Sequence, residues 1–156
     1  MSAFTVTSRS VEETIEIGRR IGELLRAGDV VALVGELGAG KTYLTKGIAR
    51  GLGVNQEREV NSPTFVLINE YAGRLTLFHI DAYRLAGPDQ LSALGFEEMC
   101  QAGGVVIVEW ADRASSIMPS NSTWIEISAT SESARELRIS SKDADCLSRL
   151  RQLDLS

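Results

Sequence analysis

The sequence predicts an α/β fold in which one mixed parallel and antiparallel sheet is flanked by helices, and three observations support this prediction. A glycine-rich loop at 35–42 stands between a short apolar run and a segment with helical spacing. A second continuous apolar run, 105–108, has the character of a buried parallel strand. Two pairs of alternating segments, each around a polar turn, predict antiparallel hairpins. With 156 residues, the chain is expected to form a single domain over 1–156.

The elements of the first half are predicted from apolar spacing and from their start and stop residues. Ser10 and Glu13 have the spacing of a capping box, in which the serine accepts a backbone N–H and the glutamate reaches back. Gly28 ends the helix that they open, and Gly53 ends the helix that follows the glycine-rich loop. The expected elements are a strand at 4–7, a helix at 10–27, a strand at 29–34 and a helix at 41–52.

A hairpin is expected next, because two alternating segments flank the turn Ala72-Gly73. Before it, Pro63 restricts the preceding residue to extended geometry and indicates a loop. Further along the chain, Gly95 weakens a predicted helix without ending it, and Pro119 stops another. The expected elements are strands at 66–71 and 74–81, a helix at 88–102, a strand at 105–108, a short helix at 111–117, strands at 124–130 and 136–140, and a helix at 142–153.

The glycine-rich loop matches the phosphate-binding pattern G-x-x-x-x-G-K-[ST] at every fixed position. Glycines let the backbone N–H groups turn toward phosphate oxygens, and the N-terminus of the next helix adds partial positive charge. The lysine places its charge near the β- and γ-phosphates, and the threonine hydroxyl is a ligand for Mg2+. A nucleoside triphosphate is therefore expected to bind Glu36, Leu37, Gly38, Ala39, Gly40, Lys41 and Thr42.

Composition excludes several classes of protein. Hydrophobic residues make up 44% and charged residues 24%, as in ordinary soluble domains, and the net charge of −5 argues against a nucleic-acid binder acting alone. No apolar stretch approaches the roughly 20 residues of a membrane span, and the first residues lack the pattern of a secretory signal. Cys100 and Cys146 match no metal-ligand spacing and are interpreted as reduced packing thiols. We therefore expect a cytoplasmic protein without a membrane partner.

Two acidic residues follow predicted strands, at the edge where ligands gather in open α/β sheets. Glu109 follows the run 105–108 and is the better candidate for binding Mg2+, because its strand is expected to be central. Asp81 is then expected to orient or polarise the attacking water. His79 shares a strand face with Asp81 and is interpreted as structural rather than catalytic. Trp110 is interpreted as packing or as the wall of a binding surface.

These motifs together resemble the TsaE family of bacterial tRNA threonylcarbamoyladenosine biosynthesis proteins. Besides the loop in the form G-E-L-G-A-G-K-T, the shared segments are S-P-T-F at 62–65, H-I-D-A-Y-R-L at 79–85, L-G-F-E-E at 94–98 and V-E-W at 108–110. Many ATPases share the phosphate loop, whereas the other segments in this order are far more specific. The resemblance covers most of the chain and is weak over the last ~15 residues.

The resemblance implies a small P-loop ATPase that uses ATP and Mg2+ and works with the paired proteins TsaD and TsaB. That pair transfers a threonylcarbamoyl group to an adenosine beside the anticodon, so tRNA is reached only indirectly, and ATP hydrolysis resets the complex between turnovers. Residues 7–14 match the part expected near the adenine. The implied roles are catalysis for Lys41, Asp81 and Glu109, Mg2+ ligation for Thr42 and Glu109, a nucleotide contact for Arg135, and nucleotide sensing or partner contact for Ser62, Thr64 and Trp110.

Two other functions are compatible with the phosphate loop. A small-molecule or nucleotide kinase would need a second substrate pocket and an arginine-rich lid, and no stretch of this chain is arginine-rich. A nucleotide-dependent binding module with little turnover would use the same residues as a slow ATPase. The residues also leave open which of Asp81 and Glu109 ligates Mg2+ directly, and whether the base is adenine or guanine.

Overall fold

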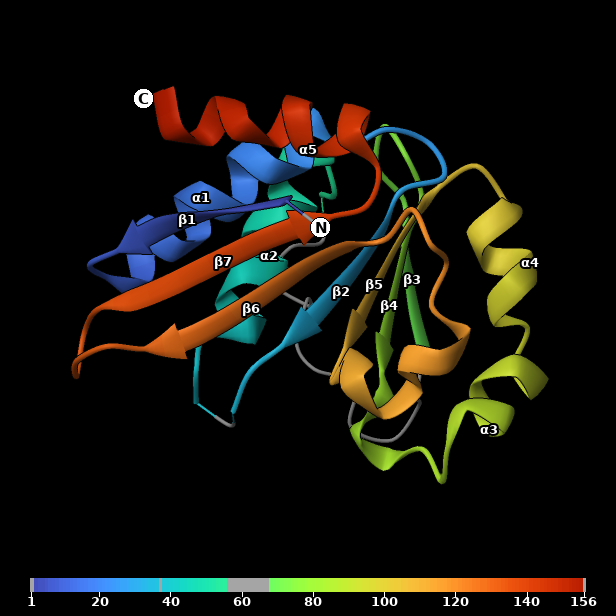
Figure 1. The fold of residues 1–156 in the computed structure, drawn as a ribbon. Helices are drawn as coiled ribbons and strands as arrows, with labels where there is room; N and C mark the ends of the chain where they lie inside the picture. Colours follow the sequence, from blue (N-terminus) through green and yellow to red (C-terminus); the bar gives the residue numbers. More distant parts are fainter. Residues whose placement is uncertain (1, 37, 56–67, 156) are drawn as a thin grey trace.

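The computed structural model describes residues 2–36, 38–55 and 68–155, and these form one seven-stranded mixed sheet with helices on both faces (Figure 1). The elements are β1 (Ser2–Ser8), α1 (Val11–Leu24), β2 (Val30–Val34), α2 (Lys41–Gly51), β3 (Ile68–Tyr71), β4 (Leu77–Asp81), η2 (Ala82–Arg84), α3 (Pro88–Ala93), α4 (Phe96–Gln101), β5 (Val105–Glu109), η3 (Ala111–Ile117), β6 (Thr123–Ala129), β7 (Arg135–Ser141), α5 (Ala144–Leu150) and η4 (Arg151–Leu155).

The sheet has the order β1-β7-β6-β2-β5-β4-β3, with the strand before the glycine-rich loop in the middle. Strands β4, β5, β2 and β6 run parallel, whereas β3, β7 and β1 are antiparallel to their neighbours. The expected mixed sheet with two hairpins is confirmed, and so is the central position of the strand that ends in Glu109. The carboxyl ends of β2, β5 and β4 therefore meet at one edge of the sheet.

Each face of the sheet has its own apolar core. Helices α1, α2 and α5 cover one face, and α3, α4 and η3 cover the other. Alternation along the strands divides their side chains between the two cores, so that Ile107 faces α2 while Val106 and Val108 face α3 and α4. By the same alternation, His79, Asp81 and Glu109 lie on the face that α2 covers.

Helices α1 and α2 pack backbone against backbone because glycines face each other where they cross. Gly18 approaches Gly47, and Gly22 approaches Gly51, one turn further along both helices. A Cβ atom added at Gly47 would lie 2.1 Å from the carbonyl oxygen of Ile15, which leaves no room for any side chain. Because the pairing advances in the same direction along both helices, the helices are parallel and their N-termini lie at the same end.

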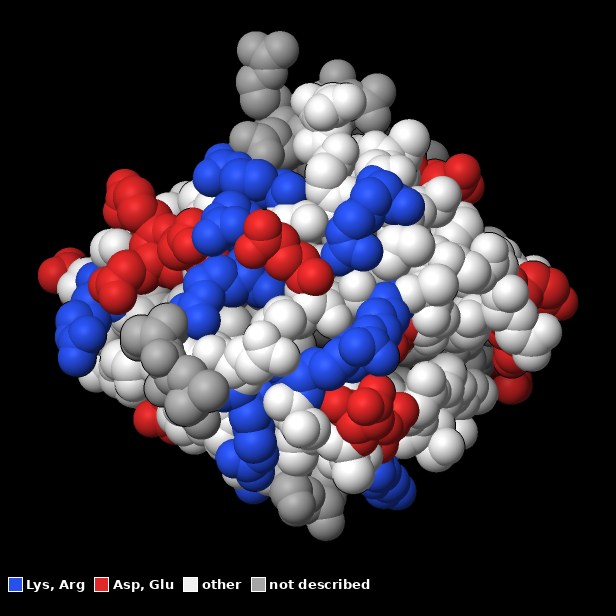
Figure 2. Space-filling model, turned by 90° about the horizontal axis from the view of Figure 1, so that it is seen from above, with Lys and Arg blue, Asp and Glu red and all other residues white. Residues whose placement is uncertain are grey.

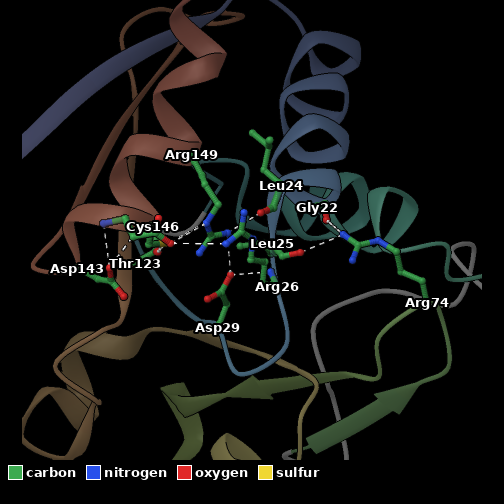
Figure 3. A network of polar contacts seen from close by, with 11 residues as sticks. Gly22, Leu24, Leu25, Arg26, Asp29, Arg74, Thr123, Asp143, Cys146 and Arg149 are labelled. Atoms are coloured by element: carbon green, nitrogen blue, oxygen red, sulfur yellow. Dashed lines mark hydrogen bonds and ion pairs between the residues drawn. The ribbon is translucent and has the colours of Figure 1, made fainter.

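The predicted start of α1 is confirmed, but its predicted end is wrong. The Ser10 hydroxyl accepts from the backbone N–H of Glu13 (3.0 Å), while the Glu13 carboxylate accepts from the N–H of Arg9 rather than Ser10. The helix ends at Leu24 instead of Ala27, since Leu25 is already extended. Arginines from distant elements satisfy its last carbonyls (Figure 3): Arg74 donates to Gly22 and Leu25, and Arg149 donates to Leu24.

The single helix predicted over 88–102 is also wrong. Gly95 has φ of +90°, a left-handed conformation that ends α3 and caps α4, so the segment forms two short helices. The strand expected from Arg74 begins only at Leu77. The helix expected to run to 153 ends at Leu150 and continues as the 3-10 helix η4.

The cysteines lie where packing thiols are expected. Cys146 is buried and Cys100 is partly buried, and both are free thiols. Burial raises the pKa of Cys100 to about 11, with the nearby charge of Glu97 adding to the effect. Burial also raises the pKa of Cys146, so neither thiol is a ready nucleophile near neutral pH. Among the described residues, no helix combines the length and apolar character required to cross a lipid bilayer.

Candidate active site

The glycine-rich loop turns from β2 into α2 through two glycines in left-handed conformations. Gly38 has φ of +80° and Gly40 has φ of +110°, and α2 begins directly after Gly40. The N–H of Ala39 donates to the carbonyl of Glu36 (3.0 Å), which closes the turn. This geometry is the expected one for a phosphate-binding loop at a helix N-terminus. Leu37, which the sequence also assigns to the nucleotide, lies outside the described residues.

Lys41 is held inside this turn. Its ammonium group donates to the carbonyls of Gly35 and Glu36 and lies over the Trp110 ring, 4.2 Å from the centroid. The side chain is buried, and burial lowers the pKa of Lys41 although the surrounding carboxylates act in the opposite direction. A cation that has lost most of its hydration and faces a nest of backbone groups is well placed to bind phosphate oxygens.

Asp81 and Glu109 lie side by side at the ends of β4 and β5, where the strand register makes them direct partners. Both carboxylates are buried, Glu109 almost completely with 1% exposure. Oδ1 of Asp81 accepts from the N–H of Tyr83 (2.9 Å) and so caps the short helix η2. Oε2 of Glu109 forms a hydrogen bond with Nε2 of His79. The structure thus brings the two predicted acids together beside Lys41, on whose charge both act.

A cavity of about 670 Å³ opens above the loop and is large enough for a nucleotide. Its walls come from four parts of the chain that are far apart in sequence. The described residues that line it are Ser10, Val11, Glu12, Thr14, Gly38, Gly40, Lys41, Thr42, Tyr43, Lys46, Glu109, Trp110, Glu132, Ser133 and Arg135. Part of the segment 7–14, which is expected near the adenine, therefore lines the cavity. The parallel packing of α1 on α2 brings it there.

Arg135 reaches the loop from the start of β7. Its Nε donates to the carbonyl of Ala39 (2.9 Å), and Nη1 donates to the carbonyl of Ala134 (2.9 Å) and to that of Ser131 (3.2 Å). The guanidinium therefore fastens the turn before β7 to the phosphate loop. Because Arg135 also lines the cavity, its predicted nucleotide contact is compatible with this place.

Trp110 forms a wall of the cavity and has an unusual backbone. It is the only residue other than glycine with positive φ among the described residues, at +59°. Its ring covers Lys41 on one side and packs on Tyr83 at 4.9 Å, and the Arg113 guanidinium lies 4.8 Å over the Tyr83 ring. Strained backbone of this kind costs about 1–3 kcal/mol and persists where surrounding contacts hold it, commonly at functional sites.

Ser62 and Thr64 lie outside the described residues. The glycine contacts between α1 and α2 were not predicted. The available signal was the four-residue spacing of Gly18 and Gly22 on α1, which Gly47 and Gly51 repeat on α2. The contact of His79 with Glu109 was not predicted either, since 30 residues separate them.

The oxygen donors at the cavity suit Mg2+ bound together with a nucleotide. Thr42 and Glu109 both line it, and each offers oxygen, the ligand that Mg2+ prefers. Within the described ranges, no group of three or more His, Cys, Asp or Glu residues could hold a metal without help. This is expected for Mg2+, which takes one or two protein ligands and completes its shell with phosphates and water.

Comparisons with known proteins agree with this geometry. Residues 8–137 match the family model described as threonylcarbamoyl adenosine biosynthesis protein TsaE. The chain is 41% identical over 132 residues to the protein named tRNA threonylcarbamoyladenosine biosynthesis protein TsaE from Treponema pallidum, covering 85% of this chain and 96% of that relative. It is 42% identical over 127 residues to the protein of the same name from Bacillus subtilis, covering 81% and 78%. The crystal structure of YdiB from Bacillus subtilis superposes with a TM-score of 0.81 at 30% identity, over 99% of this chain and 95% of that one.

Proposed function

The chain belongs to the TsaE family of tRNA threonylcarbamoyladenosine biosynthesis proteins, and on this premise we propose that the cavity beside Lys41 is a Mg2+-dependent ATPase site. The family places the chain in the pathway of this tRNA modification, as its ATPase component. The observation that carries the proposal for the site is the meeting of a phosphate loop with two buried carboxylates at one edge of the sheet.

The proposed division of labour follows from where each group lies. Lys41 and the loop N–H groups bind the β- and γ-phosphates. Thr42 and Glu109 hold Mg2+, which neutralises developing charge on the phosphates when it is bound. Asp81 stands beside Glu109 in the register of β4 and β5 and orients the attacking water. Burial of both acids keeps bulk water from competing for these contacts.

The proposed partners are TsaD and TsaB, acting as a pair, with tRNA reached only through the complex. On the face that Figure 2 shows, acidic side chains stand beside many of the basic ones. Ion pairs such as Arg19 with Glu16 and Arg26 with Asp145 illustrate this mixing. Ser62 and Thr64 are proposed, from the sequence alone, to couple the nucleotide state to docking on this pair.

Replacing each acid by its amide is expected to separate the two roles. Asp81→Asn should keep Mg2+-ATP affinity within about threefold and reduce hydrolysis with TsaD–TsaB by about 100-fold or more, the usual size of a general-base effect. Glu109→Gln should lower the affinity for ATP in the presence of Mg2+ by about 10-fold, since an amide is a poorer ligand for a hard cation. The measurements are calorimetric titration with ATP at several Mg2+ concentrations and the rate of phosphate release.

Asp89→Asn is the matched control, because Asp89 is exposed in the first turn of α3 and takes no part in the cavity. It should leave both measurements unchanged. If Asp81→Asn loses Mg2+-dependent binding while Glu109→Gln keeps it, the two roles are exchanged. If neither change affects binding or hydrolysis, this edge of the sheet is not the ATPase site.

A further inference from the structure

His79 is a buried polar residue that the proposed mechanism leaves without a role. It lies in the middle of β4, where it pairs in register with Asn69 on β3 and Ile107 on β5. Its side chain has no exposed surface, and it is not among the residues that line the cavity. Direct contact of His79 with a nucleotide is therefore ruled out by its position behind the site.

The imidazole of His79 has one polar contact that reaches the site. Its Nε2 forms a hydrogen bond with Oε2 of Glu109, and Glu109 itself lines the cavity. Nδ1 is buried and, within the part of the chain that the structure describes, has no hydrogen-bond partner. An N–H group at Nδ1 would thus be buried without an acceptor, at a cost of about 1–3 kcal/mol. The proton is consequently best placed on Nε2, which donates it to the carboxylate.

We propose that His79 is a positioning residue that holds the Glu109 carboxylate in the orientation needed to bind Mg2+ with ATP. A buried carboxylate requires a donor, and His79 supplies one from a fully packed strand, so the ring itself has little freedom to move. Groups that orient a metal ligand in this way commonly change metal affinity when they are removed. The inference rests on the proposed role of Glu109, and its tests distinguish the two.

The first test is the position of the proton on the ring, which does not depend on activity or on bound metal. His79 is the single histidine of the chain, so a protein labelled with nitrogen-15 in histidine gives ring-nitrogen NMR signals from this imidazole alone. We expect a one-bond N–H coupling at Nε2, and a changed Nε2 signal in the folded Glu109→Gln variant. Absence of a proton from Nε2, or a signal that Glu109→Gln leaves unchanged, would overturn the proposal.

The second test compares two amides that differ only in reach. Glutamine places its NH2 group about where Nε2 lies, whereas asparagine reaches only to the place of Nδ1. His79→Gln should bind an ATP analogue in Mg2+ within about threefold of wild type, and His79→Asn about 10-fold more weakly, as for other supporting groups of metal ligands. Both variants should bind the analogue equally well when EDTA removes Mg2+, since His79 does not touch the nucleotide.

Each outcome of this comparison supports or overturns the positioning role of His79. Equal binding by His79→Asn and wild type in Mg2+ would overturn the positioning role, and so would a loss that persists in EDTA, because that would indicate a purely structural role. If His79→Asn does not fold, the proton position in the wild type decides instead. If Glu109→Gln binds ATP in Mg2+ as tightly as wild type while the NMR coupling is as expected, the proposed role of Glu109 fails and the contact between His79 and Glu109 stands.

Discussion

Lys41→Ala is expected to weaken ATP binding by about 100-fold, the largest effect on ATP affinity among the changes considered at the cavity. The buried ammonium makes charge-assisted hydrogen bonds to phosphate oxygens, each worth about 1.5–3 kcal/mol, and alanine provides no substitute. The loop carbonyls of Gly35 and Glu36, to which the ammonium donates, remain as backbone groups and add no positive charge. Calorimetric titration with Mg2+-ATP measures the loss, and the rise in melting temperature on adding ATP should vanish with it.

Lys142→Ala is the matched control for this experiment. Lys142 is exposed between β7 and α5 and does not line the cavity, so its removal deletes the same charge from the chain without touching the loop. ATP affinity should be unchanged in this variant. An Lys41→Ala protein that still binds Mg2+-ATP as tightly as the Lys142→Ala protein would refute the assignment of the loop to the phosphates.

Gly47→Ala is expected to cost about 3 kcal/mol of unfolding free energy, the upper part of the range for overpacking a well-packed interface. The added Cβ would lie 2.1 Å from the carbonyl oxygen of Ile15 and 2.9 Å from Cα of Gly18, and both are backbone atoms. Relief therefore requires α1 to move away from α2, which opens the core between them. For a domain of this size the melting temperature should fall by about 10 °C, measured by circular dichroism.

Gly87→Ala separates this effect from the general effect of replacing glycine. Gly87 has an extended backbone with φ of 167° and no atom within 4 Å of an added Cβ, so alanine fits there. The melting temperature of the Gly87→Ala protein should stay within about 2 °C of wild type, as is usual for surface changes. If Gly47→Ala is equally mild, the helices are not held at backbone contact, and the position of α1 at the cavity needs another explanation.

The parts of the fold and site that could be predicted from sequence are those set by local patterns. The phosphate loop has a fixed spacing, the buried parallel strands are continuous apolar runs, and an acid directly after such a run must lie at the carboxyl edge of the sheet. For these reasons the amino-acid pattern alone was sufficient to place Lys41, Asp81 and Glu109 together. The Ser10 cap at the start of α1 is local in the same way.

The parts that could not be predicted depend on residues that are distant in sequence. Arg74 and Arg149 bind carbonyls at the end of α1 (Figure 3). Arg74 is 52 residues from Gly22, and Arg149 is 125 residues from Leu24. Gly95 divides the helix predicted over 88–102 because it adopts a left-handed conformation. Its low helix propensity alone predicted only a less stable helix. The contact of His79 with Glu109 required the register of two parallel strands, which no periodicity reveals.

We propose that this cavity binds ATP and that the γ-phosphoryl group is transferred to water in support of the TsaD–TsaB pair. The most direct measurement follows the label from γ-labelled ATP in the presence of Mg2+, with the chain alone and with the pair added. We predict that the label leaves as inorganic phosphate, faster with the pair, and that Lys41→Ala removes the release. Label that is transferred to another molecule, or that stays in ATP when the pair is present, would contradict the claim.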